Sequence, residues 1–532
     1  MLQKLPNFFL ALLSGLLFSA GWFSPFTFLI FFAWIPLLTI EHKISIDVRA
    51  KNQKLQLILF SYLSFFIWNI CVTWWVSFAS VGGACLAFIG NSAFMCTTFM
   101  IWHNLKKRLQ KPWAIWLLIP IWLGYEYGHT LWDLTWSWLI MGNAFAFQHQ
   151  WIQWYEYTGA SGGSLWILIV NILCFQSIQS GHYSLQKMVK PILAILAPLF
   201  FSLILYWFTS QKTAAQKNES YKTVVIQPNI DPYNDKFYFE PEVHLQNLLK
   251  QIKGQLDSTV DFLVLPETYL TENIFEGKEQ HAYSLNLLHD SLLKPYPNLT
   301  IISGACTIHR YAPSEEKSST AQKHEPSGDY FDSFNTGMQF NQEGISYYHK
   351  SKLVPGVERM PFPALLKPLE RFAIDLGGTM GSLGTQPERT VFFSHQHKVG
   401  IAPVICYESV YSDYVSDYID NGANLIFILT NDGWWENTPG HQQHLAYAKL
   451  RAIESRREIA RCANTGISCF ITPYGDIEQA TPYWEQAVIT KNMTPTNTKT
   501  FFTKFGDLIS YSSSAIAILL LIWSQFLRFK KS

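Results

Sequence analysis

The sequence has little charge for its length. Only 15% of its 532 residues are Asp, Glu, Lys or Arg, whereas 49% are hydrophobic. This balance excludes an ordinary soluble protein, yet it leaves too much charge for a chain that lies wholly within a membrane. The net charge of +1 indicates neither a nucleic-acid partner nor a polybasic surface. We therefore expect one membrane part and one globular part.

The sequence also lacks a cysteine framework. None of its eight cysteines forms a Cys-x-x-Cys pair, so neither a zinc site nor a disulfide scaffold is indicated and no metal is expected. Three cysteines are expected to pack in the core of the globular part, namely Cys306, Cys462 and Cys469. A disulfide between Cys306 and Cys462 is compatible with an oxidising compartment, but nothing in the sequence requires it.

Long hydrophobic runs are concentrated before residue 210. A bilayer core needs about 20 mainly apolar residues per helix. Eight segments are predicted to form membrane helices on this basis, with limited polar interruption: 8–23, 26–40, 55–78, 84–105, 112–128, 163–180, 191–209 and 512–526. The segment 132–154 is rich in Trp but also holds Asp133, His149 and three glutamines, which suits an interfacial or re-entrant piece better than a lipid-facing span. A cleaved signal peptide at 1–23 is disfavoured because further hydrophobic segments follow at once.

Basic residues gather in alternate connections between these segments. They lie in 42–54, 106–111, 181–190 and the C-terminal tail "RFKKS". Because short cytoplasmic loops carry the excess of Lys and Arg, these connections and both termini are expected inside. We therefore predict seven membrane helices in 1–210, an extracytoplasmic domain at 211–507, and a last helix with a basic cytoplasmic tail at 508–532.

The expected outer domain has the pattern of an α/β fold. Short apolar runs bounded by turn residues predict strands in "KTVVIQPNI", "DFLVLPET", "LTIISGAC", "KVGIAPVICYES", "ANLIFILTNDGW" and "CANTGISCFITPYGD". Helical spacing predicts helices at 241–255 and 443–462, the second with Arg451, Glu454 and Arg457 at intervals that allow pairing. A hairpin with a turn at 342–344 and a loop at 311–329 complete the prediction.

Three strand or hairpin ends carry reactive side chains: Glu267, Lys350 and Cys406. Side chains at the carboxyl ends of strands can converge on one crevice. A thiol needs a base or a nearby cation to react at neutral pH, so Glu267 would take its proton and Lys350 would stabilise an oxyanion. Each residue alone has a simpler interpretation. A cysteine at a strand end usually packs in the core, a glutamate in Pro-Glu-Thr usually belongs to a turn or a helix cap, and a lysine after a hairpin strand is usually exposed to solvent.

Longer motifs favour the chemical interpretation. The stretches "VIQPNIDPYNDKF", "VLPET", "YHKSKLVPGVERMP", "VICYES" and "TNDGWWENTPGHQQHLAYAKLRAIESRREIARCANTG" occur in this order. Through them the chain resembles, over essentially its whole length, the apolipoprotein N-acyltransferases of bacterial inner membranes, which are a membrane-embedded branch of the nitrilase, or carbon–nitrogen hydrolase, superfamily. The resemblance implies an αββα sandwich beside a polytopic bundle of about eight helices. It also implies a triad of Glu267 as base, Lys350 as cation and Cys406 as nucleophile.

The resemblance implies further site residues. Glu358 matches a second required glutamate, and Tyr407 and Glu408 match the two residues after the nucleophile. Trp434 matches an aromatic bordering the acyl pocket, although simple packing explains it equally well. Phe237 stands where the family often has Trp.

Two loops depart from the family pattern. Gly-Val-Glu at 356–358 replaces Phe-Gly-Glu, and "NDGWW" replaces Asn-Asp-Ala-Trp-Phe. These departures affect the expected shape of the pocket, and so its preference for acyl chain or acceptor, rather than the chemistry.

The implied reaction is a ping-pong acyl transfer without a cofactor. A membrane glycerophospholipid would donate a fatty acyl chain to Cys406, and the α-amine of a diacylglyceryl-cysteine on an apolipoprotein would accept it. The resemblance places the protein, as a monomer, in the bacterial inner membrane with its catalytic domain in the periplasm. Two alternatives stay open: a membrane-anchored amidase that hydrolyses a small amide, and a non-enzymatic transporter or scaffold.

Overall fold

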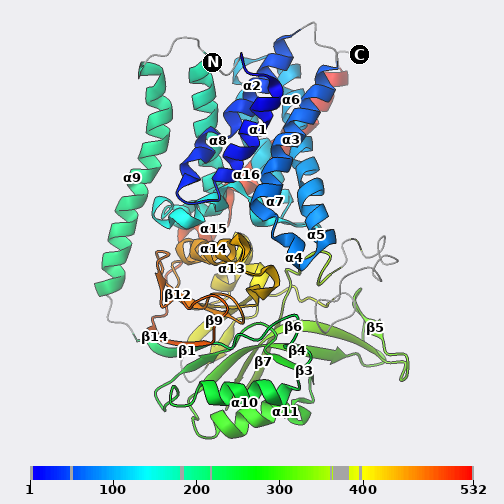
Figure 1. The fold of residues 1–532 in the computed structure, drawn as a ribbon, viewed down its shortest axis with the longest axis vertical. Coiled ribbons are helices and arrows are strands. Elements are labelled where there is room, and N and C mark those ends of the chain that lie inside the picture. The colour runs from blue at the N-terminus through cyan, green and yellow to red at the C-terminus, as the bar shows by residue number, and fades with distance from the viewer. Residues whose placement is uncertain are drawn as a thin grey trace. The chain divides into compact units, whose positions relative to one another are not determined.

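The computed structural model describes residues 4–47, 52–179, 185–215, 219–359, 362, 383–394 and 398–529 (Figure 1). The chain forms two compact units. The helical unit comprises Met1–Ser77, Val81–Thr209 and Phe505–Ser532, and the sandwich unit comprises Phe78–Ser80 and Ser210–Lys504. Parts of the predicted basic loops (48–51 and 181–184) and the end of the tail (530–532) lie outside the described residues.

All eight predicted apolar segments of the helical unit contain helix. The main α-helices are α1 (Asn7–Ala20), α2 (Trp34–Ile46), α3 (Gln53–Thr73), α6 (Asn91–Leu109), α7 (Leu118–Gly128), α8 (Tyr155–Gln179), α9 (Leu185–Ala215) and α16 (Leu508–Phe529). Short helices α4 (Val76–Ala79), α5 (Val81–Cys85) and α15 (Phe501–Phe505) lie at its connections. Three of these α-helices are shorter than a span needs, because α1 has 14 residues, α2 has 13 and α7 has 11. α2 reaches span length together with a 3₁₀ helix at Phe26–Phe32 that precedes it.

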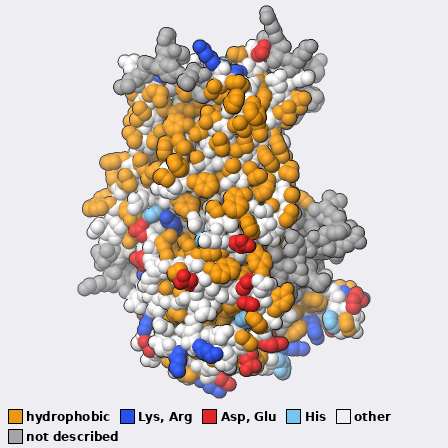
Figure 2. Space-filling model, in the orientation of Figure 1, with side chains coloured by type: hydrophobic (Ala, Val, Ile, Leu, Met, Phe, Trp, Pro, Cys, Tyr) orange, Lys and Arg blue, Asp and Glu red, His pale blue; other side chains and the backbone are white. Residues whose placement is uncertain are grey.

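Six helices among the described residues are long and apolar enough to cross a membrane. They are Phe26–Ile46, Gln53–Thr73, Val81–Leu109, Tyr155–Gln179, Gln186–Thr213 and Leu508–Gln525. Hydrophobic side chains crowd the surface of this unit (Figure 2). On α9, for example, Leu193 is 58% and Phe200 68% exposed, as expected of side chains that face lipid.

The Trp-rich segment differs from these spans. Between α7 and α8 the chain forms short 3₁₀ helices at Ser137–Leu139 and Met141–Trp151. No long helix is described between residues 129 and 154, in agreement with the prediction that this segment is not a lipid-facing span.

The first sheet of the sandwich unit has eight strands. They are β1 (Tyr221–Gln227), β2 (Phe262–Val264), β3 (Leu270–Phe275), β4 (Thr300–Arg310), β5 (Gln322–Lys323), β6 (Tyr330–Asn341), β7 (Gly344–His349) and β14 (Ala487–Met493). β1, β2 and β4 run parallel, β14 pairs antiparallel with β1, and β6 pairs antiparallel with β4 and β7. The β6–β7 pair is the predicted hairpin.

The second sheet has the order β13-β12-β11-β10-β9-β8. Its strands are β8 (Phe392–Ser394), β9 (Val399–Ile405), β10 (Leu425–Thr430), β11 (Ile459–Ala463), β12 (Cys469–Ile471) and β13 (Ile477–Glu478). β9, β10 and β11 are parallel and fully buried, which explains their unbroken apolar runs. The two sheets face each other, since the Cys462 thiol on β11 lies 3.2 Å from the Ile226 carbonyl oxygen on β1.

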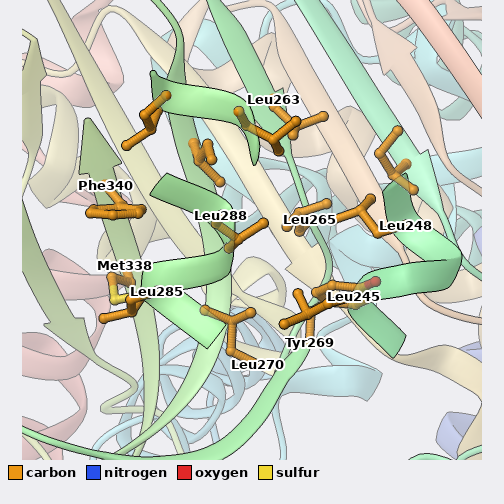
Figure 3. Close-up of a cluster of buried hydrophobic side chains, with 14 of the residues drawn as sticks. Leu245, Leu248, Leu263, Leu265, Tyr269, Leu270, Leu285, Leu288, Met338 and Phe340 are labelled. Carbon is orange, nitrogen blue, oxygen red and sulfur yellow. The ribbon is translucent and has the colours of Figure 1, made fainter. Parts of the chain in front are cut away.

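Helices cover the outer face of each sheet. α10 (Pro241–Gln251) and α11 (Tyr283–Leu288) pack on the first sheet and bury Leu245, Leu248, Leu285 and Leu288 against its strands (Figure 3). α13 (Ser412–Asp420) and α14 (Pro439–Ser455) contact the second sheet. The predicted αββα sandwich is therefore confirmed.

Several details of the prediction are wrong. The helix predicted at 443–462 ends at Ser455, because Arg456 adopts a left-handed conformation with φ of +51°, and the chain then enters β11. The expected pair of Arg451 and Glu454 forms at 2.8 Å. Arg457 does not join it but donates to backbone oxygens of Ala423, Ser455 and Thr498. Strand β14 was not anticipated. All eight cysteines are free thiols, so the disulfide between Cys306 and Cys462 that the sequence left open does not form.

Candidate active site

Cys406 lies at a sharp turn directly after a buried strand. β9 ends at Ile405, and Cys406 opens a 3₁₀ turn that runs to Val410. The φ angle of Cys406 is +47°, a left-handed conformation that non-glycine residues rarely adopt. Such strain persists only where the surrounding structure enforces it, and it often marks a functional position. Here the turn presents the thiol at the end of the strand.

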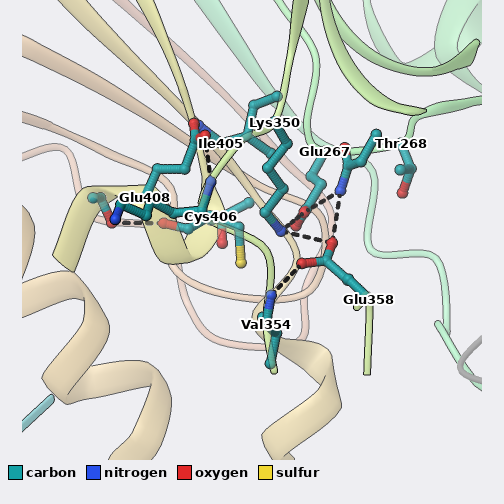
Figure 4. Close-up of polar contacts among 12 residues, drawn as sticks. Glu267, Thr268, Lys350, Val354, Glu358, Ile405, Cys406 and Glu408 are labelled. Carbon is teal, nitrogen blue, oxygen red and sulfur yellow. Dashed lines mark hydrogen bonds and ion pairs between the residues drawn. The ribbon is translucent and has the colours of Figure 1, made fainter. Parts of the chain in front are cut away.

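Glu267 and Lys350 are brought together beside this turn (Figure 4). Glu267 follows β2, and Lys350 follows β7. The Lys350 ammonium donates a hydrogen bond of 3.0 Å to Oε1 of Glu267 and one of 2.8 Å to Oε1 of Glu358. Glu358 keeps this contact despite the altered loop sequence, because its Oε2 accepts from the Val354 N–H at 2.8 Å.

Asn335, on a further strand, also hydrogen-bonds to both of these carboxylates. Its side-chain amide donates to Oε1 of Glu267 at 2.8 Å and to Oε1 of Glu358 at 3.1 Å. It lies on β6, inside the stretch "DSFNTGMQF" that sequence reasoning treated only as a strand of the hairpin. One buried ammonium and one amide thus satisfy two carboxylates.

The electrostatics of the three groups set their protonation states before substrate binds. Burial would raise the pKa of Glu267, but the positive charges of Lys350 and Lys236 outweigh it and hold the pKa below its ordinary value. Burial and the nearby charge of Glu267 raise the pKa of the Cys406 thiol, whereas Lys350 acts in the opposite direction. Burial alone would lower the pKa of Lys350, but Glu267 and Glu358 raise it well above its usual range. The resting site therefore holds a neutral thiol, an ionised glutamate and a charged lysine.

The backbone of Glu267 is positioned by a close approach to β4. A Cβ atom on Gly304 would lie 2.3 Å from the Thr268 nitrogen and 2.5 Å from the Glu267 Cα atom, so only glycine fits. We expect Gly304→Ala to destabilise the protein by about 2 kcal/mol, because the backbone must shift. We also expect acyl transfer to fall by about 100-fold, since a displaced base costs rate. Thermal unfolding and steady-state kinetics measure the two effects.

Gly337 provides the matched control. It pairs with Gly304 across β4 and β6, but its Cβ atom would come no closer than 3.3 Å to any neighbour, the nearest atoms being the Pro403 Cβ atom at 3.3 Å and the Ile405 Cδ1 atom at 3.6 Å. Gly337→Ala should therefore lose less stability and keep most of the activity. Equal losses in the two variants would contradict this account of Gly304.

Glu408 supports the turn from behind rather than facing the thiol. Its Oε1 accepts hydrogen bonds from the Tyr348 hydroxyl at 2.6 Å and the Ser351 N–H at 2.8 Å, and its Oε2 accepts from the Ile405 N–H at 2.9 Å. Burial raises the pKa of Glu408, although these hydrogen bonds act to lower it. Tyr407 is buried and packs edge-on against Tyr411, with ring centroids 5.2 Å apart.

The three triad candidates open onto one cavity. Its lining includes Glu267, Lys350, Glu358 and Cys406 together with the aromatic rings of Phe237 and Trp434. The Tyr233 hydroxyl donates to the Trp434 carbonyl oxygen at 2.8 Å and holds that loop. Cys306 also lines the cavity, so the prediction that it is simple core packing is wrong.

A buried polar network fixes the turn of Cys406 to the "NDGWW" loop. His444 lies between the two, with Nε2 3.1 Å from the Cys406 carbonyl oxygen and Nδ1 2.9 Å from Asp432. Arg461 donates to the other Asp432 oxygen at 2.6 Å. Burial would raise the pKa of Asp432, but Arg461 and His444 outweigh it and lower that pKa strongly. Gly433 in this loop makes room for Thr465, whose Oγ1 would lie 2.0 Å from an added Cβ atom.

Sequence reasoning missed Asn335, His444, Asp432 and Lys236. Asp432 and His444 lie within the motif quoted for the family resemblance, and Lys236 directly precedes Phe237, so their positions were visible. A polar residue in a strand or helix, however, looks the same whether it faces water or a buried partner. Only the fold distinguishes these cases.

Comparison with known proteins identifies the family of this chain. The family model described as "Carbon-nitrogen hydrolase" matches residues 223–500, and the model "Apolipoprotein N-acyltransferase N-terminal domain" matches residues 14–173. An apolipoprotein N-acyltransferase of Chlorobaculum tepidum is 29% identical over 96% of this chain and 95% of its own length. Those of Rickettsia typhi and Haemophilus influenzae are 26% and 24% identical and cover 95% and 99% of this chain, and 95% and 97% of their own.

Solved structures of the nitrilase superfamily also align with part of the chain. A Saccharomyces cerevisiae member is 15% identical with a TM-score of 0.37, over 52% of this chain and 91% of that protein. An amidase of a Nesterenkonia species is 12% identical with a TM-score of 0.35, over 53% of this chain and 93% of the amidase. From the two family models and the near full-length relatives, the chain belongs to the apolipoprotein N-acyltransferase family of the carbon–nitrogen hydrolase superfamily.

Proposed function

We propose that this protein transfers a fatty acyl chain from a membrane phospholipid, through a thioester on Cys406, to the α-amine of the diacylglyceryl-cysteine of an apolipoprotein. The observation that carries the proposal is the Lys350 ammonium, which lies 3.0 Å from Glu267 and 2.8 Å from Glu358 in the cavity that Cys406 also lines. The near full-length relatives named apolipoprotein N-acyltransferase support the choice of acceptor.

The first half-reaction forms the thioester. Glu267 takes the proton of the Cys406 thiol, and the sulfur attacks the carbonyl carbon of the phospholipid ester. Lys350 stabilises the negative charge that develops on the carbonyl oxygen. Glu267 then gives its proton to the departing alkoxide, so the ester C–O bond breaks and a lysophospholipid leaves. The ester itself supplies the activated acyl group.

The second half-reaction repeats these roles with a different nucleophile. The neutral α-amine of the acceptor attacks the thioester carbon, Glu267 accepts a proton from the amine, and Lys350 again stabilises the oxyanion. The C–S bond breaks, the sulfur recovers its proton from Glu267, and an amide-linked third acyl chain is released. Each proton and each acyl group is thereby accounted for.

The membrane helices fit substrates that are both lipids. Moving an acyl chain into water costs about 0.8 kcal/mol for each exposed CH₂ group, so a soluble enzyme would bear a large penalty. We place the protein in the bacterial inner membrane with its sandwich unit in the periplasm. The basic end of α6, with Lys106, Lys107 and Arg108, would then face the cytoplasm.

Mass spectrometry of the purified protein tests this proposal. After incubation with phospholipid, the peptide that contains Cys406 should carry an added fatty acyl mass and lysophospholipid should accumulate. A diacylglyceryl-cysteine peptide should then remove the adduct and gain the same acyl mass. Rapid turnover of a small amide, with no fatty acyl adduct, would instead support an amidase.

A further inference from the structure

A second lysine lies buried beside the candidate triad. Lys236 is located between β1 and α10, and only 1% of its surface is exposed. Its ammonium donates hydrogen bonds of 2.7 Å to the carbonyl oxygen of Glu267 and 2.7 Å to Oγ1 of Thr268. The acyl-transfer steps described above leave this charged group without a role.

The backbone that Lys236 holds is in an unfavourable conformation. Thr268 has a φ of +46°, which is strongly disfavoured for a β-branched residue. A strained turn persists only where its surroundings fix it, and hydrogen bonds from a charged donor are strong restraints. Without them, relaxation of the turn would move the Glu267 carboxylate relative to Lys350.

The charges at the site indicate a second effect of Lys236. Lys350 is hydrogen-bonded to two carboxylates, those of Glu267 and Glu358, so this group of three carries one excess negative charge. Buried charge without a partner is costly, and here it would oppose negative charge on the sulfur or on an oxyanion. With the ammonium of Lys236, the net charge of the two carboxylates and the two lysines is zero.

We propose that Lys236 is a positioning residue for the reaction at Cys406, because it fixes the Glu267–Thr268 turn and balances the second carboxylate. The inference rests on the proposed function in treating Cys406 as the reacting group. The thiol proton passes to Glu267 and returns, while Lys236 keeps its own proton throughout.

The groups around Lys236 define the pH at which this effect should disappear. Glu267 after β2, Cys306 on β4 and Cys406 after β9 act on the ammonium electrostatically. His244 on α10 places Nε2 3.1 Å from the Lys236 carbonyl oxygen, and Asp235 precedes Lys236 in the chain. Burial lowers the pKa of Lys236 to about 8, with Glu267 acting in the opposite direction. Below that pH the group is charged, and above it the group is neutral.

The rate of Cys406 alkylation by iodoacetamide in the full-length protein tests the proposal. We expect Lys236→Met to react about tenfold more slowly than the wild type near pH 7, and to show a clearly smaller deficit near pH 9.5, where the wild-type lysine has lost its charge but still donates hydrogen bonds to the turn. Lys236→Arg keeps its charge at both values, so it should react faster than the wild type near pH 9.5. Lys250→Met, at an exposed position of α10, is the control and should match the wild type.

Two outcomes would overturn the proposal. One is an equal alkylation rate for Lys236→Met and the wild type near pH 7, and the other is a deficit of the same size at both pH values, which a purely structural role would give. If Lys236→Met does not fold, the comparison of Lys236→Arg with the wild type above pH 8 decides the matter. Failure of the proposed function would appear separately, as the absence of an acyl adduct on the wild-type protein.

Discussion

Replacing Cys406 with alanine is expected to abolish the acyl adduct and to lower acyl transfer by about 10⁴- to 10⁶-fold, the loss typical when an enzyme's covalent nucleophile is removed. The fold should survive, because alanine and cysteine meet the same backbone strain at the φ of +47°. Removal of one buried sulfur atom should cost only about 1 kcal/mol. Intact-protein mass spectrometry and transfer kinetics measure the two losses, and circular dichroism checks the fold.

Cys469→Ala is the matched control for this variant. Cys469 is a fully buried thiol on β12, and none of the proposed chemical steps uses it. This variant should keep the adduct and most of its activity. An adduct on another residue of Cys406→Ala, or transfer at more than a small fraction of the wild-type rate, would rule out a thioester at this position.

Replacing Lys350 with methionine should reduce both activity and stability. Transfer is expected to fall by about 10³-fold, because the oxyanion loses its charged partner. The free energy of unfolding at neutral pH should fall by about 3 kcal/mol or more, because the buried Glu267 and the partly buried Glu358 lose the cation that they share. Transfer kinetics and chemical denaturation measure these effects.

The stability loss in Lys350→Met should depend on pH. In the wild type the folded-state pKa of Glu267 lies below its ordinary value of 4.5, so its contribution is present above that pH and is lost as the pH falls. In the variant, loss of the Lys350 charge raises the pKa of this carboxyl above its wild-type position, so protonation begins at a higher pH and the deficit should shrink as the pH falls. Lys323→Met, on the exposed side of β5, should show neither effect. A deficit that is constant with pH would contradict the role given to Lys350.

Much of the fold can be predicted from the sequence alone, because the strongest sequence patterns arise within single strands and helices. Buried parallel strands such as β9 and β10 appear as unbroken apolar runs, and the apolar helices are longer still. The turn residues after such runs also place Glu267, Lys350 and Cys406 at strand or hairpin ends. The resemblance to a known family then assigns these three residues their expected roles.

The features that were missed depend on contacts between distant parts of the chain. β14 has half-exposed side chains in the mixed sequence "AVITKNM", and it becomes a strand by pairing with β1. The helix predicted at 443–462 is longer than the observed one. The observed helix ends at the left-handed Arg456, and arginine is not a residue typical of helix ends. Asn335 and Lys236 look like ordinary surface residues in the sequence, and only folding brings them to Glu267.

The pairing of β14 with β1 has a consequence for the evolution of this architecture. The register joins Tyr221 to Met493, so the sandwich begins and finishes on neighbouring strands at one border of a sheet. A module whose two ends are adjacent can be accommodated by a single insertion point in a host chain. A soluble hydrolase could thus have been acquired by a set of membrane helices in one genetic event, ahead of the last helix, without rearrangement of its interior.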